Sequence, residues 1–137
     1  MMKFKIKTIK TADVDAVVAL YRDAGWWEDD YVAEDFIPAV VANSCCFVGA
    51  FLPDGTMVGM GRALADGISD AYIQDIAVLN DYRQQGVGSM IIRHIIACLR
   101  EQDIDWIGLI GEPGTGSFYN KLGFKELKNF IPMKLEL

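Results

Sequence analysis

The stretch that decides the fold is Tyr72-Ile-Gln-Asp-Ile-Ala-Val-Leu-Asn-Asp-Tyr-Arg-Gln-Gln-Gly-Val-Gly-Ser-Met-Ile-Ile-Arg93. It opens with an apolar run over residues 71–78, which predicts a buried strand. A polar turn and a glycine pair follow, and then apolar residues recur with helical spacing at Ile91, Ile92, Ile95, Ile96 and Leu99. The first turn of a helix carries unpaired N–H groups and a partial positive charge, and glycines let an anion approach the backbone. The segment therefore predicts a phosphate or pyrophosphate site.

The spacing of the glycines narrows the choice of ligand. A dinucleotide-binding loop needs a third glycine where this chain has Ile91, and a P-loop needs a Gly-Lys-Ser/Thr end that is absent from the sequence. The pattern present is Arg-x-x-Gly-x-Gly, from Arg83 to Gly88. After a strand, it resembles the signature of the GNAT superfamily of acyl-CoA-dependent N-acetyltransferases. A second block, Phe118-Tyr-Asn-Lys-Leu-Gly-Phe124, resembles the later motif of that family, so the resemblance extends over nearly the whole chain.

The composition limits the class of protein. The 137 residues, of which 52% are hydrophobic, suit a single domain over residues 1–137. No apolar run reaches about 18 residues, and the N-terminus alternates lysines with apolar residues, so we expect a cytoplasmic protein that does not bind a membrane. The net charge of −6 disfavours binding to nucleic acid. The same charge favours a cationic substrate, although an acidic surface can equally serve solubility.

The cysteines and the single histidine do not form a recognisable metal-binding pattern. Cys45, Cys46 and Cys98 are odd in number and lack metal-ligand spacing, so we interpret them as buried structural thiols. His94 lies in the expected helix beside Arg93, and we interpret it as a surface or edge residue. We therefore expect no metal site.

The apolar periodicity along the chain predicts an α/β (α+β) fold, with a mixed, mostly antiparallel sheet of about six or seven strands and about four helices. The strands are expected at residues 3–9, 45–52, 57–64, 71–78, 106–110, 124–127 and 131–135. The helices are expected at residues 11–24, 32–43, 88–102 and 117–122, with Thr11 as the first N-cap. Pro38 either kinks the second helix or begins a shorter one. The resemblance implies a V-shaped gap between the fourth and fifth strands, where the pantetheine arm of acyl-CoA inserts.

Transfer of an acyl group from a thioester to an amine requires an oxyanion stabiliser, a base and an acid. In the family, a bulge in the fourth strand frees backbone groups, and the resemblance places Ile76, Ala77 and Val78 there, with the Ile76 N–H polarising the carbonyl. The resemblance gives the acid role to Tyr119; packing beside Phe118 is the alternative. The implied acetyl-CoA-binding residues are Ile76, Ala77, Val78, Arg83, Gln84, Gln85, Gly86, Val87, Gly88, Ser89, Phe118 and Tyr119.

The general base has no single candidate. Tyr72 stands where some family members carry a glutamate base, which weakens the assignment of a direct base. Asp75 lies where some members hold a working carboxylate, and it could take the proton or brace the bulge. Glu28, Asp29 and Asp70, acting through water, are alternatives. Glu112 replaces an asparagine that contacts the cofactor in many members.

The segment Gly25–Tyr31 concentrates aromatic and acidic residues between the first two helices. In the family this region borders the acceptor pocket, so we expect an aromatic and acidic lip that gathers an amine, partly by cation–π contact. The alternative is that the tryptophans pack as core while Glu28, Asp29 and Asp30 stay solvated. The expected acceptor-binding residues are Trp26, Trp27, Glu28, Tyr31 and Tyr72.

The leading hypothesis is an N-acetyltransferase that moves acetyl from acetyl-CoA to a primary amine of a small molecule by direct attack. One alternative is a catalytically silent acyl-CoA-binding module, which Tyr72 in the base position favours. Another is a protein acetyltransferase acting on a lysine or an N-terminus, which the lack of an added recognition segment disfavours. The expected partners are acetyl-CoA and the small amine, and the assembly is left open between a monomer and a homodimer.

Overall fold

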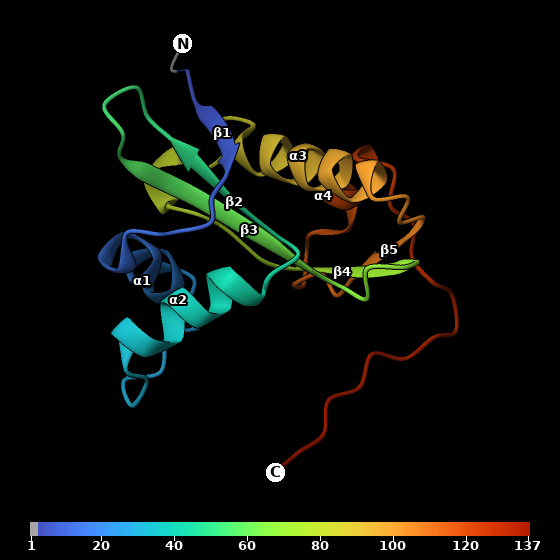
Figure 1. Cartoon of the computed structure of the whole chain (residues 1–137). Helices are drawn as coiled ribbons and strands as arrows, with labels where there is room; N and C mark the ends of the chain where they lie inside the picture. Colours follow the sequence, from blue (N-terminus) through green and yellow to red (C-terminus); the bar gives the residue numbers. More distant parts are fainter. Residues whose placement is uncertain (1–2) are drawn as a thin grey trace.

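The computed structural model describes residues 3–137 as a five-stranded sheet with four α-helices (Figure 1). The strands lie in sequence order: β1 (Lys5–Thr8), β2 (Cys46–Phe51), β3 (Met57–Ala65), β4 (Asp70–Val78) and β5 (Trp106–Leu109). Neighbouring strands are antiparallel except for β4 and β5, which are parallel. The predicted α/β class, the antiparallel meander and the parallel pair are thus confirmed. Met1 and Met2, which the predicted domain includes, lie outside the described residues.

The helices cover both faces of the sheet. Helix α3 (Val87–Glu101) crosses one face and contacts β2, β3 and β4 (Figure 1). The short helix α4 (Gly116–Lys121) packs on the same side, against the cluster that α3 forms with the sheet. Helices α1 (Val14–Asp23) and α2 (Ala33–Asn43) pack together on the opposite face. A 3-10 turn, η1 (Asn80–Tyr82), connects β4 to the loop before α3.

Each face of the sheet carries its own apolar core. Of the stripe that the sequence predicts on α3, Ile96 is partly buried and the other four residues are fully buried. The stripe packs against Val48, Val58 and Ala63. On the other face, Val17 and Leu20 of α1 and Ile37 of α2 pack against Phe47 and Met60. Burial of one large aliphatic side chain contributes about 1.5–3 kcal/mol, so these two clusters are the main source of stability.

The helix ends correct two details of the sequence prediction. The N-cap of α1 is Asp13, whose carboxylate accepts a hydrogen bond of 3.3 Å from the backbone N–H of Ala16, whereas Thr11 was expected in this role. Helix α2 runs through Pro38, so a shorter helix beginning at this proline is wrong. The missing proline N–H removes one bond from the helix ladder. No helix within residues 3–137 combines the length and hydropathy that a bilayer crossing requires.

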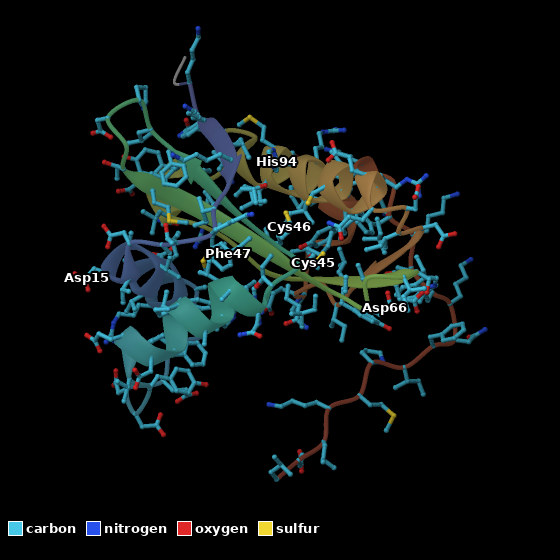
Figure 2. All side chains as sticks on the ribbon, viewed as in Figure 1. Asp15, Cys45, Cys46, Phe47, Asp66 and His94 are labelled. Atoms are coloured by element: carbon cyan, nitrogen blue, oxygen red, sulfur yellow. The ribbon has the colours of Figure 1, made fainter. Side chains whose placement is uncertain are left out.

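The thiols and the histidine lie where β1, β2 and α3 meet (Figure 2). Cys46 is buried, and Cys45 and Cys98 are half-buried. Burial, with a smaller effect from the neighbouring Cys98 thiol, raises the pKa of Cys46 to about 12, so this thiol stays protonated at neutral pH. His94 is half-buried, with its Nε2 3.0 Å from the Thr8 hydroxyl, as expected of an edge residue.

The predicted strands 124–127 and 131–135 are wrong. Residues 124–137 contain no strand, and the chain runs away from the sheet after Phe124 (Figure 1). The described sheet is therefore smaller than predicted and ends at β5. An alternating apolar pattern forms a strand only where another edge offers hydrogen bonds, and the pattern does not specify that edge.

Candidate active site

Strands β4 and β5 pair only over the first part of β4. Their register runs from Asp70 opposite Trp106 to Ile73 opposite Leu109, where β5 ends, whereas β4 continues to Val78. A cavity of about 340 Å³ opens where the pairing stops. Its lining residues are Trp26, Tyr72, Ile73, Gln74, Asp75, Ile76, Leu109, Ile110, Glu112 and Tyr119. The gap that the sequence analysis expects between the fourth and fifth strands is thus present.

A β-bulge lies on β4 beside this cavity. Arg62 of β3 pairs with Gln74 and Met60 pairs with Ala77, so Asp75 and Ile76 together face the single residue Gly61. Asp75 has φ +58°, a left-handed conformation that few residues other than glycine adopt. Ile76 lies in the bulge as expected, but Ala77 is back in register, so the bulge begins one residue earlier than predicted.

Gly61 sets the position of the bulge. A Cβ atom at Gly61 would lie 2.4 Å from Cδ1 of Ile76 and 2.8 Å from Cγ2 of Ile91. The side chain of Ile76 therefore occupies the space that the glycine leaves open. The bulge depends on a contact between two strands, which explains why counting along β4 alone misplaced it.

The carboxylate of Asp75 is held from two elements. Its Oδ2 accepts a hydrogen bond of 2.8 Å from the Tyr21 hydroxyl on α1 and one of 2.7 Å from Nε of Arg62 on β3. Burial, followed by the charge of Asp75, raises the pKa of Tyr21 well above its usual value, so the phenol remains a donor. The sequence analysis missed Tyr21 and Arg62. The sequence did contain one indication of this contact: Arg62 is the only charged residue in the otherwise apolar strand β3.

The loop before α3 presents free backbone donors. Gly86, at the N-cap of α3, has φ +83°, and a Cβ atom there would meet nothing within 4 Å. Within the described chain, the backbone N–H groups of residues 84–89 donate to no protein acceptor. The loop therefore leaves backbone donors unpaired where the sequence predicts an anion. The loop adjoins the open part of β4, since a Cβ atom at Gly88 would lie 4.0 Å from Cγ2 of Val78 and 3.3 Å from the Phe118 ring.

Arg83 holds this loop in place. Its Nε donates a hydrogen bond of 2.8 Å to the Val78 carbonyl, and its Nη2 lies 2.9 Å from Oδ2 of Asp23 on α1. The guanidinium thus ties the end of β4 and the C-terminal turn of α1 to the loop. In the predicted cofactor segment Arg83–Ser89, the backbone N–H groups of residues 84–89 are free to bind an anion. The side chain of Arg83 is not, because it already bonds to Val78 and Asp23.

Tyr119 reaches the cavity from α4. Its ring packs edge-to-face against Phe118 and Phe124, with centroid distances of 4.9 and 5.9 Å. Its hydroxyl makes no hydrogen bond to any other residue of the described chain. Burial, and secondly the charge of Glu112, raise the pKa of Tyr119. The phenol is therefore protonated at neutral pH and free to donate.

The predicted acceptor-binding residues divide into two groups. Trp26 and Tyr72 line the cavity. Trp27 and Tyr31 instead pack with Phe36 of α2, the Tyr31 and Phe36 rings being stacked with centroids 4.4 Å apart. Glu28 is exposed and does not line the cavity. The carboxylates that do line it are Asp75 and Glu112, and the acceptor prediction included neither.

The fold is that of a known protein family. The family model of the Acetyltransferase (GNAT) domain matches residues 42–126, more than half of the chain. The chain therefore belongs to the GNAT superfamily.

The similar proteins include both curated sequences and solved structures. The uncharacterized N-acetyltransferase ycf52 of Pyropia yezoensis is 40% identical over 68 residues, which are 50% of this chain and 39% of that relative. A GNAT family acetyltransferase of Streptococcus pneumoniae TIGR4 superposes with a TM-score of 0.83 at 24% identity, covering 98% of both chains. AAC(6')-Iy, in complex with the bisubstrate analog CoA-S-monomethyl-acetylneamine, superposes with a TM-score of 0.76 at 18% identity over 98% of this chain and 99% of the other.

The first prediction concerns the bulge. Gly61→Ala should destabilise the protein by about 1–3 kcal/mol, because the added methyl group overpacks the contact between Ile76 and α3. Gly116→Ala is the matched control, since a Cβ atom there meets nothing within 4 Å. Urea denaturation measures both variants. Equal stability of the two would mean that the bulge does not depend on the empty space at Gly61.

The second prediction concerns Arg83. Arg83→Gln should lower the unfolding free energy of the ligand-free protein by about 1 kcal/mol, because a charged hydrogen bond and a partly exposed ion pair are lost. Arg93→Gln, an exposed site on α3, should change it little. Chemical denaturation without acetyl-CoA measures the difference. If Arg83→Gln keeps the unfolding free energy of the wild type and loses only affinity for acetyl-CoA, Arg83 contacts the cofactor and does not hold the loop in place.

Proposed function

We propose that this protein transfers the acetyl group of acetyl-CoA to a primary amine of a small molecule, by direct attack in the cavity between β4 and β5. Proteins of this family use acyl-CoA. The observation that carries the proposal is a continuous path along β4. The path begins at Tyr119 and the bulge, follows the unpaired edge of β4 to Val78, and reaches the free N–H groups of the loop before α3.

The path suits the shape and charge of the cofactor. The pyrophosphate would lie on the N–H groups of residues 84–89, where the helix dipole also favours an anion. The pantetheine arm would lie along the edge of β4 from Ile76 to Val78, where its amides can bond as a neighbouring strand would. Phe118 would close the outer side of the loop. The CoA-based ligand of AAC(6')-Iy supports this use of the fold.

The residues around the bulge fit the chemistry of acyl transfer. The amine nitrogen forms a bond to the thioester carbonyl carbon, and the oxyanion is stabilised by the Ile76 N–H. The C–S bond then breaks, and the thiolate takes a proton from Tyr119, which solvent later reprotonates. The ammonium proton leaves through Oδ1 of Asp75, because Arg62 and Tyr21 already occupy Oδ2. Asp75 thereby combines the two roles that the sequence analysis left open.

The cavity favours a small cationic acceptor. Asp75 and Glu112 contribute carboxylates to it, and Trp26 and Tyr72 contribute aromatic faces that attract an ammonium group. Glu28, Asp29 and Asp30 are exposed outside the cavity, so their contribution is to raise the local concentration of cations. The predicted cytoplasmic location stays a prediction.

A silent acyl-CoA-binding module is the second candidate. Tyr72 lines the cavity at the position where a glutamate base would stand, and the carboxylate of Asp75 is engaged by Arg62. Such a module would bind acetyl-CoA through the same loop but would release no thiol with any amine. Measuring binding and turnover on the same preparation therefore separates the two candidates.

The third prediction concerns the cofactor. Saturating acetyl-CoA should raise the melting temperature of the wild type, since a ligand present at 100 times its Kd stabilises the native state by about 2.7 kcal/mol. Gly86→Glu should abolish this shift by placing a carboxylate in the anion site. Gly67→Glu is the matched control: Gly67 has φ +78°, close to the +83° of Gly86, and equal space around it. An unchanged melting temperature of the wild type would refute the assignment of the cofactor.

The fourth prediction concerns the acid. Tyr119→Phe should lower kcat by roughly 10²-fold in a thiol-release assay over a panel of small amines, with little change in acetyl-CoA affinity. Tyr82→Phe, which lies outside the cavity, is the control. Because the pKa of Tyr119 is raised, its deprotonation should cause no loss of rate at neutral or mildly alkaline pH, where the rate should increase as the amine loses its proton. An unchanged kcat would return Tyr119 to a packing role.

A further inference from the structure

A second cavity, of about 570 Å³, lies beside the N-terminal half of α1 and shares no lining residue with the cavity between β4 and β5. Its walls come from β1 and the chain after it, from α1, from the turn between β2 and β3, and from the residue that follows β4. The lining residues are Lys7, Ile9, Thr11, Ala12, Asp13, Ala16, Ala19, Phe51, Gly55, Thr56, Met57 and Leu79. A volume of this size suits a small-molecule ligand.

The cavity exists because α1 covers only part of its face of the sheet. The helix packs mainly against β3 and β4, whereas β1 packs mainly against α3 on the opposite face (Figure 1). Ala16 and Ala19 line the cavity with methyl groups, which leaves the space between α1 and β1 unfilled. Side chains alternate along β1, and Phe4 and Ile6 pack toward α3, so Lys7 lies on the face of the cavity.

The cavity has an apolar floor and a polar rim. The floor is formed by Met57, which is buried, and by Ile9, Phe51 and Leu79, which are half-buried in the cluster under α1 and α2. The exposed residues Thr11 and Thr56 add hydroxyl groups at the rim. This arrangement suits a ligand that has an apolar body and one polar end.

Lys7 is the charged group at the rim that is free to bind a ligand. Its Nζ lies 4.6 Å from the centroid of the Phe51 ring, and it has no carboxylate partner within residues 3–137. The carboxylate of Asp13, which also lines the cavity, already accepts the N–H of Ala16 and is balanced by the dipole of α1. Residues 3–10 include four lysines and no acidic residue. A ligand with a single negative charge therefore complements the cavity.

Two walls of the cavity belong to the elements that hold Arg83. Leu79 follows Val78, whose carbonyl accepts the hydrogen bond of 2.8 Å from Nε of Arg83. Ala19 lies one helical turn before Asp23, whose carboxylate is 2.9 Å from Nη2 of Arg83. A ligand between these walls therefore acts on both contacts of Arg83, and through them on the loop before α3.

We propose that this cavity is an effector site for a small monocarboxylate with an aromatic or branched aliphatic body. The carboxylate pairs with the ammonium group of Lys7, and the body lies on Phe51, Met57 and Leu79. Occupancy changes the contacts of Arg83 and thereby the affinity of the loop for acetyl-CoA. The effect on acetyl-CoA rests on the function proposed above, whereas binding to the cavity does not.

The first test uses 4-phenylbutyrate as the probe and 4-phenylbutylamine as the matched cation. The carboxylate should shift the amide NMR signals of Ala16, Ala19 and Thr56 with a Kd of about 0.1–1 mM, and the amine should leave them nearly unchanged. Lys7→Glu should weaken binding by about 10-fold or more, because a charged hydrogen bond becomes a repulsion. Lys128→Glu makes the same change of charge outside the cavity and should have little effect. No shift at the three residues, or equal binding to wild type and Lys7→Glu, overturns the proposal.

The second test measures the effect on the loop. Saturating 4-phenylbutyrate should shift the Nε–H signal of Arg83 without acetyl-CoA present, and should change the Kd of acetyl-CoA by about 5-fold or more in calorimetry. Lys7→Glu should lose both effects at the same probe concentration. Ala19→Phe, which puts a ring into the cavity from an exposed position of α1, should block the probe and change the Kd of acetyl-CoA in the same direction as the probe does.

The outcomes of the second test separate the effector role from the proposed function. A probe that binds in the cavity but leaves the Arg83 signal and the Kd of acetyl-CoA unchanged overturns the effector role. Failure of acetyl-CoA to bind any form of the protein would contradict the proposed function, while the Arg83 signal would still report the effect of the probe. Thermal unfolding checks that Ala19→Phe is folded, and Lys7→Glu decides the question if it is not.

Discussion

The hydrogen bonds that Tyr21 and Arg62 donate to one oxygen of Asp75 are the constraint on which the candidate site depends. They hold a residue at φ +58° in the middle of β4, a conformation that costs free energy without support. Because Tyr21 comes from α1 and Arg62 from β3, the bulge is fixed between the helical layer and the sheet. The position of Ile76, and with it the position of the predicted oxyanion donor, follows from these two contacts.

Local sequence patterns predicted the parts of the fold that depend on neighbouring residues. The apolar spacing of Ile91, Ile95 and Leu99 indicated α3, and the glycine loop indicated its N-terminus. The hydrogen-bonded cluster at the bulge was not visible in this way, because Tyr21 and Asp75 are separated by 54 positions. The start of the bulge was misplaced for a similar reason, since Gly61 on the neighbouring strand determines it.

The segment around Trp26 and the C-terminal residues show two further limits of sequence reasoning. Aromatic composition suggested that Trp26, Trp27 and Tyr31 act together, but stacking against Phe36 draws Trp27 and Tyr31 into a separate cluster. Alternation at Met133 and Leu135 predicted a strand that the structure does not contain. The pattern carries no information on which edge would supply the hydrogen bonds.

Helix α1 contacts both ends of the path along β4. Tyr21 reaches the bulge, and Asp23, two residues later, reaches Arg83 at the loop before α3. A rigid displacement of this helix therefore cannot alter the bulge without altering the loop before α3. The thermodynamic consequence is linkage: any ligand that favours one position of α1 changes the affinity for the other ligand by the same factor in both directions. The connection through α1 is therefore a mechanical basis for coupling between ligands bound at the two ends of the path.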